Sequence, residues 1–167
     1  MNIHARALLF AVCLGSLIGS AGVSTAATVK TQAPCVEPGF DYCVSFTHTP
    51  ATVLIRALHF TAPSAGTAIV TFHGSMVCSN SEDFLDLFSQ ILDTNGRPDL
   101  TGPGALRHKT RLAPAPAGTT FNLASTRVFT IASAGSTTFR FRIFKFEMYE
   151  PTVCKAYTAV FTVQFVP

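Results

Sequence analysis

The sequence predicts an all-β protein, a two-sheet antiparallel β-sandwich of jelly-roll type. The first observation is a repeat, because Phe-Thr-x-x-Ser-Ala-Gly begins at Phe60 and again at Phe129, 69 residues later. Each copy reads as a strand, a short turn of small residues and a second strand. Two equivalent hairpins are expected in a two-sheet sandwich, and chance similarity in a chain rich in Ser, Ala and Gly is the alternative.

The second observation is the alternation of apolar and polar residues after each turn. Side chains of a strand point to opposite faces in turn, so this alternation indicates one buried face per strand. Between Thr67 and Met76, Ile69 is the one apolar residue on the outward face. The expected inward residues are Ala68, Val70, Phe72, Gly74 and Met76 in the first copy, and Phe139, Phe141 and Ile143 in the second.

Residues 1–26 read as a signal peptide. The positive start at Arg6, the apolar run from Ala7 to Ile18 and the small residues before Ala27 fit export followed by cleavage. The apolar run is too short to span a membrane. We therefore expect a single secreted or periplasmic β-sandwich domain over residues 27–167, with no membrane span.

Charge excludes some partners. The chain has 12 Lys and Arg and 9 Asp and Glu, so removing Arg6 with the signal peptide leaves a net charge of about +2. This near balance predicts neither nucleic acid nor an anionic membrane as a partner. The remaining length is enough to bury a core without a metal or cofactor.

Four cysteines remain in the expected mature chain. An even number in an exported protein predicts two disulfides, and four cysteines allow three pairings. The turn signal Pro38-Gly39 would bring Cys35 near Cys43, while Cys78 ends one strand and Cys154 precedes the last. We favour Cys35–Cys43 with Cys78–Cys154. A zinc site is the rival, disfavoured because the chain has no CxxC pair and no nearby histidine pair.

The first half of the domain predicts further strands. Tyr42 to Thr47 alternates, and Thr52 to Thr61 is apolar on both faces, which is typical of a central strand. Ser81 to Asp93 fits either a helix, with Ser79 and Glu82 as a capping box, or a strand with apolar side chains on both faces. The all-β surroundings favour the strand.

The second half begins with a long loop over Thr94 to Gly118, which either serves a function or hides a short strand around Ala105 to Leu112. Strands then return. The change of inward phase after Ile143 predicts a β-bulge. The expected strands are Thr126–Ala132, Ser136–Met148 and Ala156–Val166, with Phe144, Phe146 and Met148 inward after the bulge and with Tyr157, Ala159, Phe161, Val163 and Phe165 inward in the last strand.

The phrase Phe60-Thr-Ala-Pro-x-x-Gly66-x-x-x-x-x-Phe72 resembles the Pro-x-x-Gly-x-Tyr-x-Phe hairpin of the C1q/TNF-like jelly rolls and of related bacterial and phage modules. The resemblance implies a ten-stranded two-sheet sandwich, usually trimeric, that binds partners and catalyses nothing. It covers about a dozen residues, and Ala68 stands where the family pattern has an aromatic residue. No functional residue is carried over.

Candidate catalytic and metal-binding residues are few. His48, His59 and His73 would hold copper or zinc only if their strand faces met, and they share no short spacing. Glu147 and Glu150 would need a cleft between them to act as a glycosidase pair. We predict no catalytic residue, no cofactor and no metal. A small secreted hydrolase or metal-binding enzyme with an unrecognised site is the alternative.

Sugar recognition by aromatic stacking is also disfavoured by composition. The chain has no Trp and 3 Tyr, against 15 Phe. Tyrosine and tryptophan combine a flat ring with a polar group, whereas phenylalanine packs without hydrogen bonding. The aromatic residues are therefore expected to build the core.

One basic cluster stands out, formed by Arg107, His108, Lys109 and Arg111 in the expected long loop. Arg and Lys pair with phosphate, sulfate or carboxylate, so the cluster predicts an anion-binding loop, and a solvated loop is the simpler alternative. Outward Arg140 and Arg142 would extend it.

We expect an exported structural or partner-binding module that binds a protein or an anionic polysaccharide and forms a homo-oligomer such as a trimer. A subunit of a surface fibre or coat is a further alternative.

Overall fold

The computed structural model describes residues 27–32, 35, 42–79, 84–112 and 118–167, and the expected signal peptide lies outside them. Within these residues the chain forms strands and no helix, so the described part contains no helix able to cross a bilayer. The strands are β1 (Thr28–Gln32), β2 (Val44–Phe46), β3 (Thr52–Ala62), β4 (Gly66–Ser79), β5 (Phe84–Leu92), β6 (Leu106–Arg111), β7 (Thr119–Asn122), β8 (Ser125–Ile131), β9 (Gly135–Glu147) and β10 (Val153–Val166).

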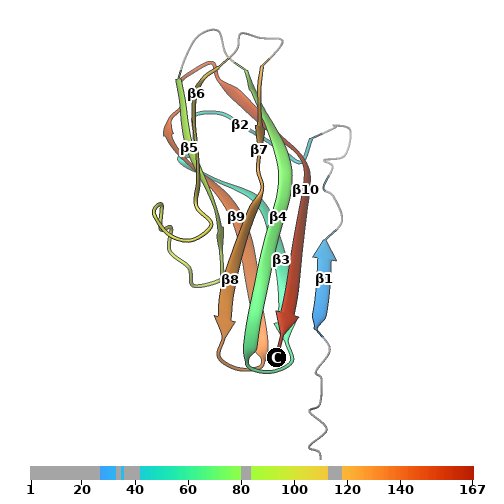
Figure 1. Ribbon diagram of the computed structural model, residues 1–167. Coiled ribbons are helices and arrows are strands. Elements are labelled where there is room, and N and C mark those ends of the chain that lie inside the picture. The colour runs from blue at the N-terminus through green and yellow to red at the C-terminus, as the bar shows by residue number, and fades with distance from the viewer. Residues whose placement is uncertain (1–26, 33–34, 36–41, 80–83, 113–117) are drawn as a thin grey trace, which may run out of the picture.

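The strands form two antiparallel sheets that pack face to face along an elongated sandwich (Figure 1). Sheet A has the order β1-β10-β4-β7, with β2 also paired to β10 and β8 also paired to β4. Sheet B has the order β3-β9-β5-β6. Because β1 and β2 share one edge of β10, and β7 and β8 share one edge of β4, each sheet has four strand positions. Eight positions with these crossovers form a jelly roll, which confirms the predicted fold class.

The inner faces of the two sheets make one apolar core. The inward residues predicted for both repeat copies are buried, apart from Gly74, which is half-buried. Phe72 of β4 and Phe141 of β9 stack with ring centroids 3.7 Å apart and planes 6° apart. Phe161 of β10 meets the Phe72 ring edge-on at 5.5 Å. Such ring pairs add to the stabilisation that comes from burying their apolar area.

A bulge changes the interpretation of β3. The stretch is apolar on both faces, which predicted a central strand, but β3 lies at an edge of sheet B. Its register against β9 shifts between Leu54 and Arg56, so Ile55 is an extra residue. Ile55 is therefore buried, and Leu58 then continues the inward face, while Leu54 is exposed. The inserted residue, rather than burial on both faces, explains the apolar pattern.

The predicted bulge in β9 exists, but it lies later in the strand. Its pairing with β5 skips Phe146, between Lys145 and Glu147. Phe146 is consequently exposed and Phe144 half-buried, so the expectation that both point inward is wrong, whereas Met148 is buried as expected.

A second irregularity corrects the last strand. The register of β10 against β4 shifts between Tyr157 and Val160, and Thr158 has a positive φ of 46°. Ala156 therefore points inward before the shift, and Ala159 points inward after it. Tyr157, predicted to face the core, is instead half-exposed, and its ring lies edge-on to Tyr42.

The two ambiguous segments of the sequence are both strands of sheet B. The strand interpretation of Ser81 to Asp93 is confirmed by β5, and the proposed capping residue Glu82 lies outside the described residues. The strand suspected within the long loop is β6. β5 lies between β9 and β6, and both of its faces are largely buried. What covers its outward face determines the chemistry of sheet B.

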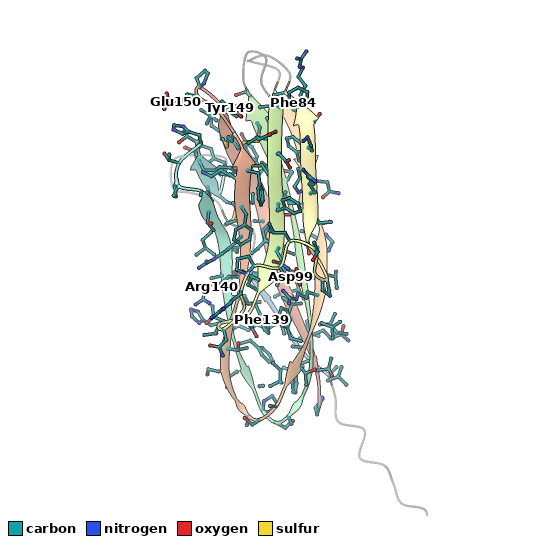
Figure 2. The ribbon with its side chains drawn as sticks, turned by 90° about the vertical axis from the view of Figure 1, so that its left-hand side faces the viewer. Phe84, Asp99, Phe139, Arg140, Tyr149 and Glu150 are labelled. Carbon is teal, nitrogen blue, oxygen red and sulfur yellow. A yellow bond between two sulfur atoms is a disulfide. The ribbon has the colours of Figure 1, made fainter. Side chains whose placement is uncertain are left out.

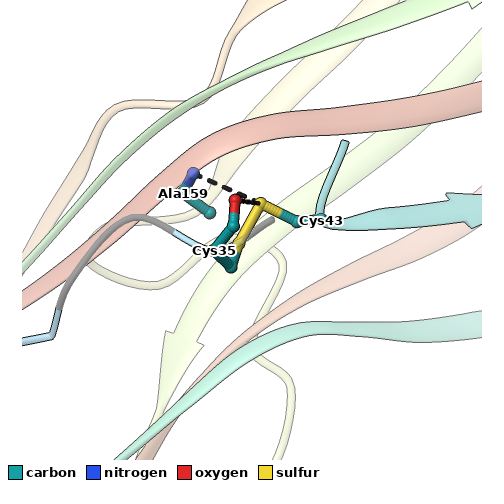
Figure 3. Close-up of a disulfide and its surroundings, with 3 residues drawn as sticks. All are labelled: Cys35, Cys43 and Ala159. Carbon is teal, nitrogen blue, oxygen red and sulfur yellow. Dashed lines mark hydrogen bonds between the residues drawn. A yellow bond between two sulfur atoms is a disulfide. The ribbon is translucent and has the colours of Figure 1, made fainter. Parts of the chain in front are cut away.

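Both disulfides have the pairing that the sequence favours. Cys78 and Cys154 stand opposite each other on β4 and β10, and their bond joins residues 76 apart in sequence. Cys35 and Cys43 are 8 residues apart. The Cys43 sulfur accepts a hydrogen bond from the Ala159 N–H at 3.5 Å, which ties this disulfide to β10 (Figure 3).

We expect the two disulfides to contribute unequally to stability. Closing a longer loop removes more entropy from the unfolded chain, which gives about 4–5 kcal/mol for Cys78–Cys154 and about 2–3 kcal/mol for Cys35–Cys43. Urea unfolding of the two double-alanine variants measures both losses. Equal losses, or a greater loss for the Cys35→Ala/Cys43→Ala variant, would contradict the chain-entropy account.

Candidate functional site

The basic cluster lies on a strand, which corrects its predicted position in a loop. It occupies β6, the edge strand of sheet B. The strand alternation separates its members, so Arg107, Lys109 and Arg111 share the outward face and His108 points the other way. His108 Nε2 lies 3.2 Å from Ser89 Oγ, and its ring meets Phe121 edge-on. Burial lowers the pKa of His108, which removes it from the group of cations.

A carboxylate within the segment from Ser81 to Asp93, which the sequence analysis did not single out, organises this face. Asp86 of β5 stands opposite Lys109, and its side chain is 5% exposed. Arg107 donates from Nε to Oδ1 at 3.0 Å and from Nη2 to Oδ2 at 2.6 Å. Lys109 Nζ lies farther from Oδ2, at 3.6 Å. The hydrogen bonds from Arg107 are the main cause that lowers the pKa of Asp86, so the carboxylate is a fixed negative charge.

The structure brings Arg140 and Arg142 onto the same face as the β6 cations. Arg142 stands opposite Gln90 and Arg140 opposite Leu92, both on β5, while β6 pairs with the other edge of β5. Neighbouring strands are about 4.8 Å apart, so the two groups of cations lie roughly 10 Å apart across β5. They are also offset along β5, because Arg107 stands opposite Phe88 and Arg111 opposite Phe84, which puts Arg111 and Arg140 roughly 26 Å apart along the strand. We call this surface the basic face: Arg107, Lys109, Arg111, Arg140 and Arg142.

One end of the basic face carries exposed aromatic rings. Figure 2 looks toward sheet B, with Phe84 and Tyr149 near one end and Arg140 in the other half. Phe84 is 48% exposed and Tyr149 56%. With Lys109 and Glu147 they line an open hollow of about 400 Å³. We call this the aromatic hollow. Its volume lies within the roughly 300–1,000 Å³ of small-molecule sites.

The other end of the face is covered by the β5–β6 connection. Gln90 is fully buried, and its side-chain amide binds the backbone of Asp99 in both directions, donating to its carbonyl at 2.8 Å and accepting from its N–H at 3.0 Å. The Gln90 amide thus pairs with the Asp99 backbone as a peptide group of a neighbouring strand would. This anchor fixes the connection against sheet B and separates the aromatic hollow from the opposite end of the sandwich.

The other candidate residues do not converge. His48 pairs with Glu150 at 3.3 Å, whereas His59 Nδ1 lies 2.8 Å from Thr138 Oγ1 and His73 is exposed on β4. Among the described residues, no three His, Cys, Asp or Glu side chains are grouped so that they could hold a metal ion. Glu147 lines the aromatic hollow, while Glu150 lines a separate cavity with His48.

Comparisons with known proteins add little to this geometry. No protein-family model matches the chain, and no curated protein matches it. Among solved structures, T=1 particles derived from infectious bursal virus are similar at 13% identity and a TM-score of 0.44, over 93% of this chain and 36% of that one. The structure of the Gx strain of infectious bursal disease virus is similar at 16% identity and a TM-score of 0.45, over 84% of this chain and 32% of that one. The chain thus spans about a third of those chains, and likeness at this level assigns no function.

We expect Arg107→Gln to destabilise the protein more than Lys109→Gln. Loss of Arg107 removes both hydrogen bonds to a carboxylate that is covered by its neighbours, whereas Lys109 contributes a longer contact. Thermal unfolding of the two variants should show a drop of several degrees for Arg107→Gln and a smaller one for Lys109→Gln. Equal midpoints would show that Asp86 does not depend on Arg107.

The Asp86 pair also predicts a dependence of stability on pH. Because the folded-state pKa is lowered, its contribution is present above the unfolded value of about 3.9 and is lost as pH falls through the folded-state pKa. The stability difference between wild type and Asp86→Asn should therefore be constant from pH 7 to pH 5 and shrink below about pH 4. A difference that stays constant down to pH 2 would contradict this assignment.

Proposed function

We propose that this protein is a non-catalytic binding module that holds an anionic polymer on the basic face of sheet B. The observation that carries the proposal is the alignment of cations from β6 and β9 on one face of one sheet. The sequence separates the two groups by about thirty residues, and the pairing of both strands with β5 unites them.

The charges on this face are only partly neutralised within the protein. Asp86 is matched by Arg107, whose guanidinium also lies 5.3 Å from the Phe88 ring centroid. Within the part of the chain that the structure describes, Arg111, Arg140 and Arg142 form no ion pair. Cations left without a carboxylate partner are available to sulfate, phosphate or carboxylate groups. Their spread over two strands, β6 and β9, on either side of β5 suits an extended polymer better than a single small anion.

The proposal includes an extracellular or periplasmic setting. Two disulfides support an oxidising compartment, because such bonds are rare in reducing cytosol. The predicted homotrimer and the alternative role as a subunit of a fibre or coat stay predictions, as does the resemblance to the C1q/TNF-like modules. A trimer would multiply the attraction to a repetitive polymer by presenting several basic faces at once.

We expect the Arg111→Gln/Arg140→Gln variant to elute from immobilised heparin at lower salt than wild type. The two substitutions remove one cation from each side of β5 and leave the Asp86–Arg107 pair intact. Attraction between exposed charges is screened over about 8–10 Å near physiological salt, so elution salt reports it directly. The free energy of unfolding should change by less than about 0.5 kcal/mol per substitution.

The matched control is Lys155→Gln, which removes a cation from β10 on sheet A. It should elute with wild type, and each single variant, Arg111→Gln and Arg140→Gln, should elute earlier. If Lys155→Gln lowers the elution salt as much as the single variants do, binding follows net charge and the basic face is not the site.

A further inference from the structure

We infer that the aromatic hollow binds one ring of an acidic sugar, a uronic acid unit within a polysaccharide. This inference rests on the proposed function and gives the anionic polymer a chemical identity. It also reverses the sequence-based expectation that the aromatic residues serve only the core, because the structure leaves Phe84 and Tyr149 about half exposed beside each other.

The hollow is built by three adjacent strands. Asp86 of β5 stands opposite Glu147 of β9 on one side and Lys109 of β6 on the other. Phe84 is two residues from Asp86 and therefore shares its face. Tyr149 follows β9 and accepts a hydrogen bond on its carbonyl from the Thr152 N–H at 2.8 Å, within a turn that returns the chain to β10. All four lining residues are thus fixed by strand pairing or by this turn.

The lining supplies aromatic rings for the C–H groups of a pyranose ring and a carboxylate for its hydroxyl groups. The C–H groups of a sugar ring pack on flat aromatic faces, and two exposed rings border the hollow. The Arg111 guanidinium lies over the Phe84 ring at 5.3 Å, which holds that ring in place. Sugar hydroxyls donate hydrogen bonds, and the Glu147 carboxylate can accept them. Glu147 forms no ion pair among the described residues.

Lys109 selects for an acidic sugar. Its ammonium lies 3.6 Å from the Asp86 carboxylate, too far for a good hydrogen bond, whereas Arg107 occupies both Asp86 oxygens. Lys109 therefore retains donors for a ligand carboxylate. A flat anionic membrane is a poorer fit, because the site is a hollow lined by side chains.

The test uses four probes in isothermal titration at fixed salt: oligogalacturonate, oligomers of alginate, methyl-esterified oligogalacturonate and poly(vinyl sulfonate). The last has charge but no sugar ring, and the ester has the ring but no charge. We expect at least one uronate oligomer to bind at least ten-fold more tightly than either the ester or poly(vinyl sulfonate) of equal length. Tyr149→Ala and Lys109→Gln should each weaken uronate binding about ten-fold, and Tyr149→Ala should leave poly(vinyl sulfonate) binding unchanged.

Phe146→Ala is the matched control, because Phe146 is 54% exposed, lies on the adjoining end of β9 and does not line the hollow. It should bind uronate like wild type. Equal affinity for uronate and poly(vinyl sulfonate), or no effect of Tyr149→Ala on uronate, would overturn the sugar inference while leaving the basic face as a charge-only site. Binding of no anionic polymer would overturn both proposals.

Discussion

The stacked contact between Phe72 and Phe141 joins an inner strand of sheet A to an inner strand of sheet B, and the remaining structure is arranged around it. Two sheets that share such a core give nearly all their inward positions to apolar side chains, and Ser89 with His108 is a polar pair among them. Polar chemistry is then confined to the outer faces, the edges and the ends. Sheet B places its charges on the outer face, and this constraint is why cations from two separated strands share one surface.

The alternation of residues was enough to predict the inward faces of β4 and of β9 as far as Ile143, because both strands are regular over these residues. It failed where one strand gains a residue relative to its partner, at Ile55, at Phe146 and after Tyr157. A bulge leaves apolar residues in both phases, and a strand buried on both faces does the same. The choice depends on the neighbouring strand, which no local pattern reveals.

The candidate site was visible only in part. The charges at 107–111 were evident, but their positions on the strand and the inward turn of His108 required β6 to be recognised between Gly- and Pro-rich segments. Asp86 gains its role from a partner 21 residues away. Phe84 and Tyr149 border one hollow because β5 and β9 are neighbours in sheet B. Composition pointed to a core made of phenylalanine, and it could not show which rings the sheet leaves outside.

The place of β10 in sheet A has a consequence for how the chain is made. β10 is the last strand in sequence, yet it lies between β4 and the β1 and β2 strands, and it carries Cys154. Until β10 has been synthesised, β4 lacks its partner along one edge, and β1 and β2 lack the strand with which they pair. A ribosome or translocation channel that releases the chain from its N-terminus therefore delivers an open sandwich, with β4 exposed along one edge. Completion of the fold is a late event, and a truncated chain is the form most exposed to aggregation and proteolysis.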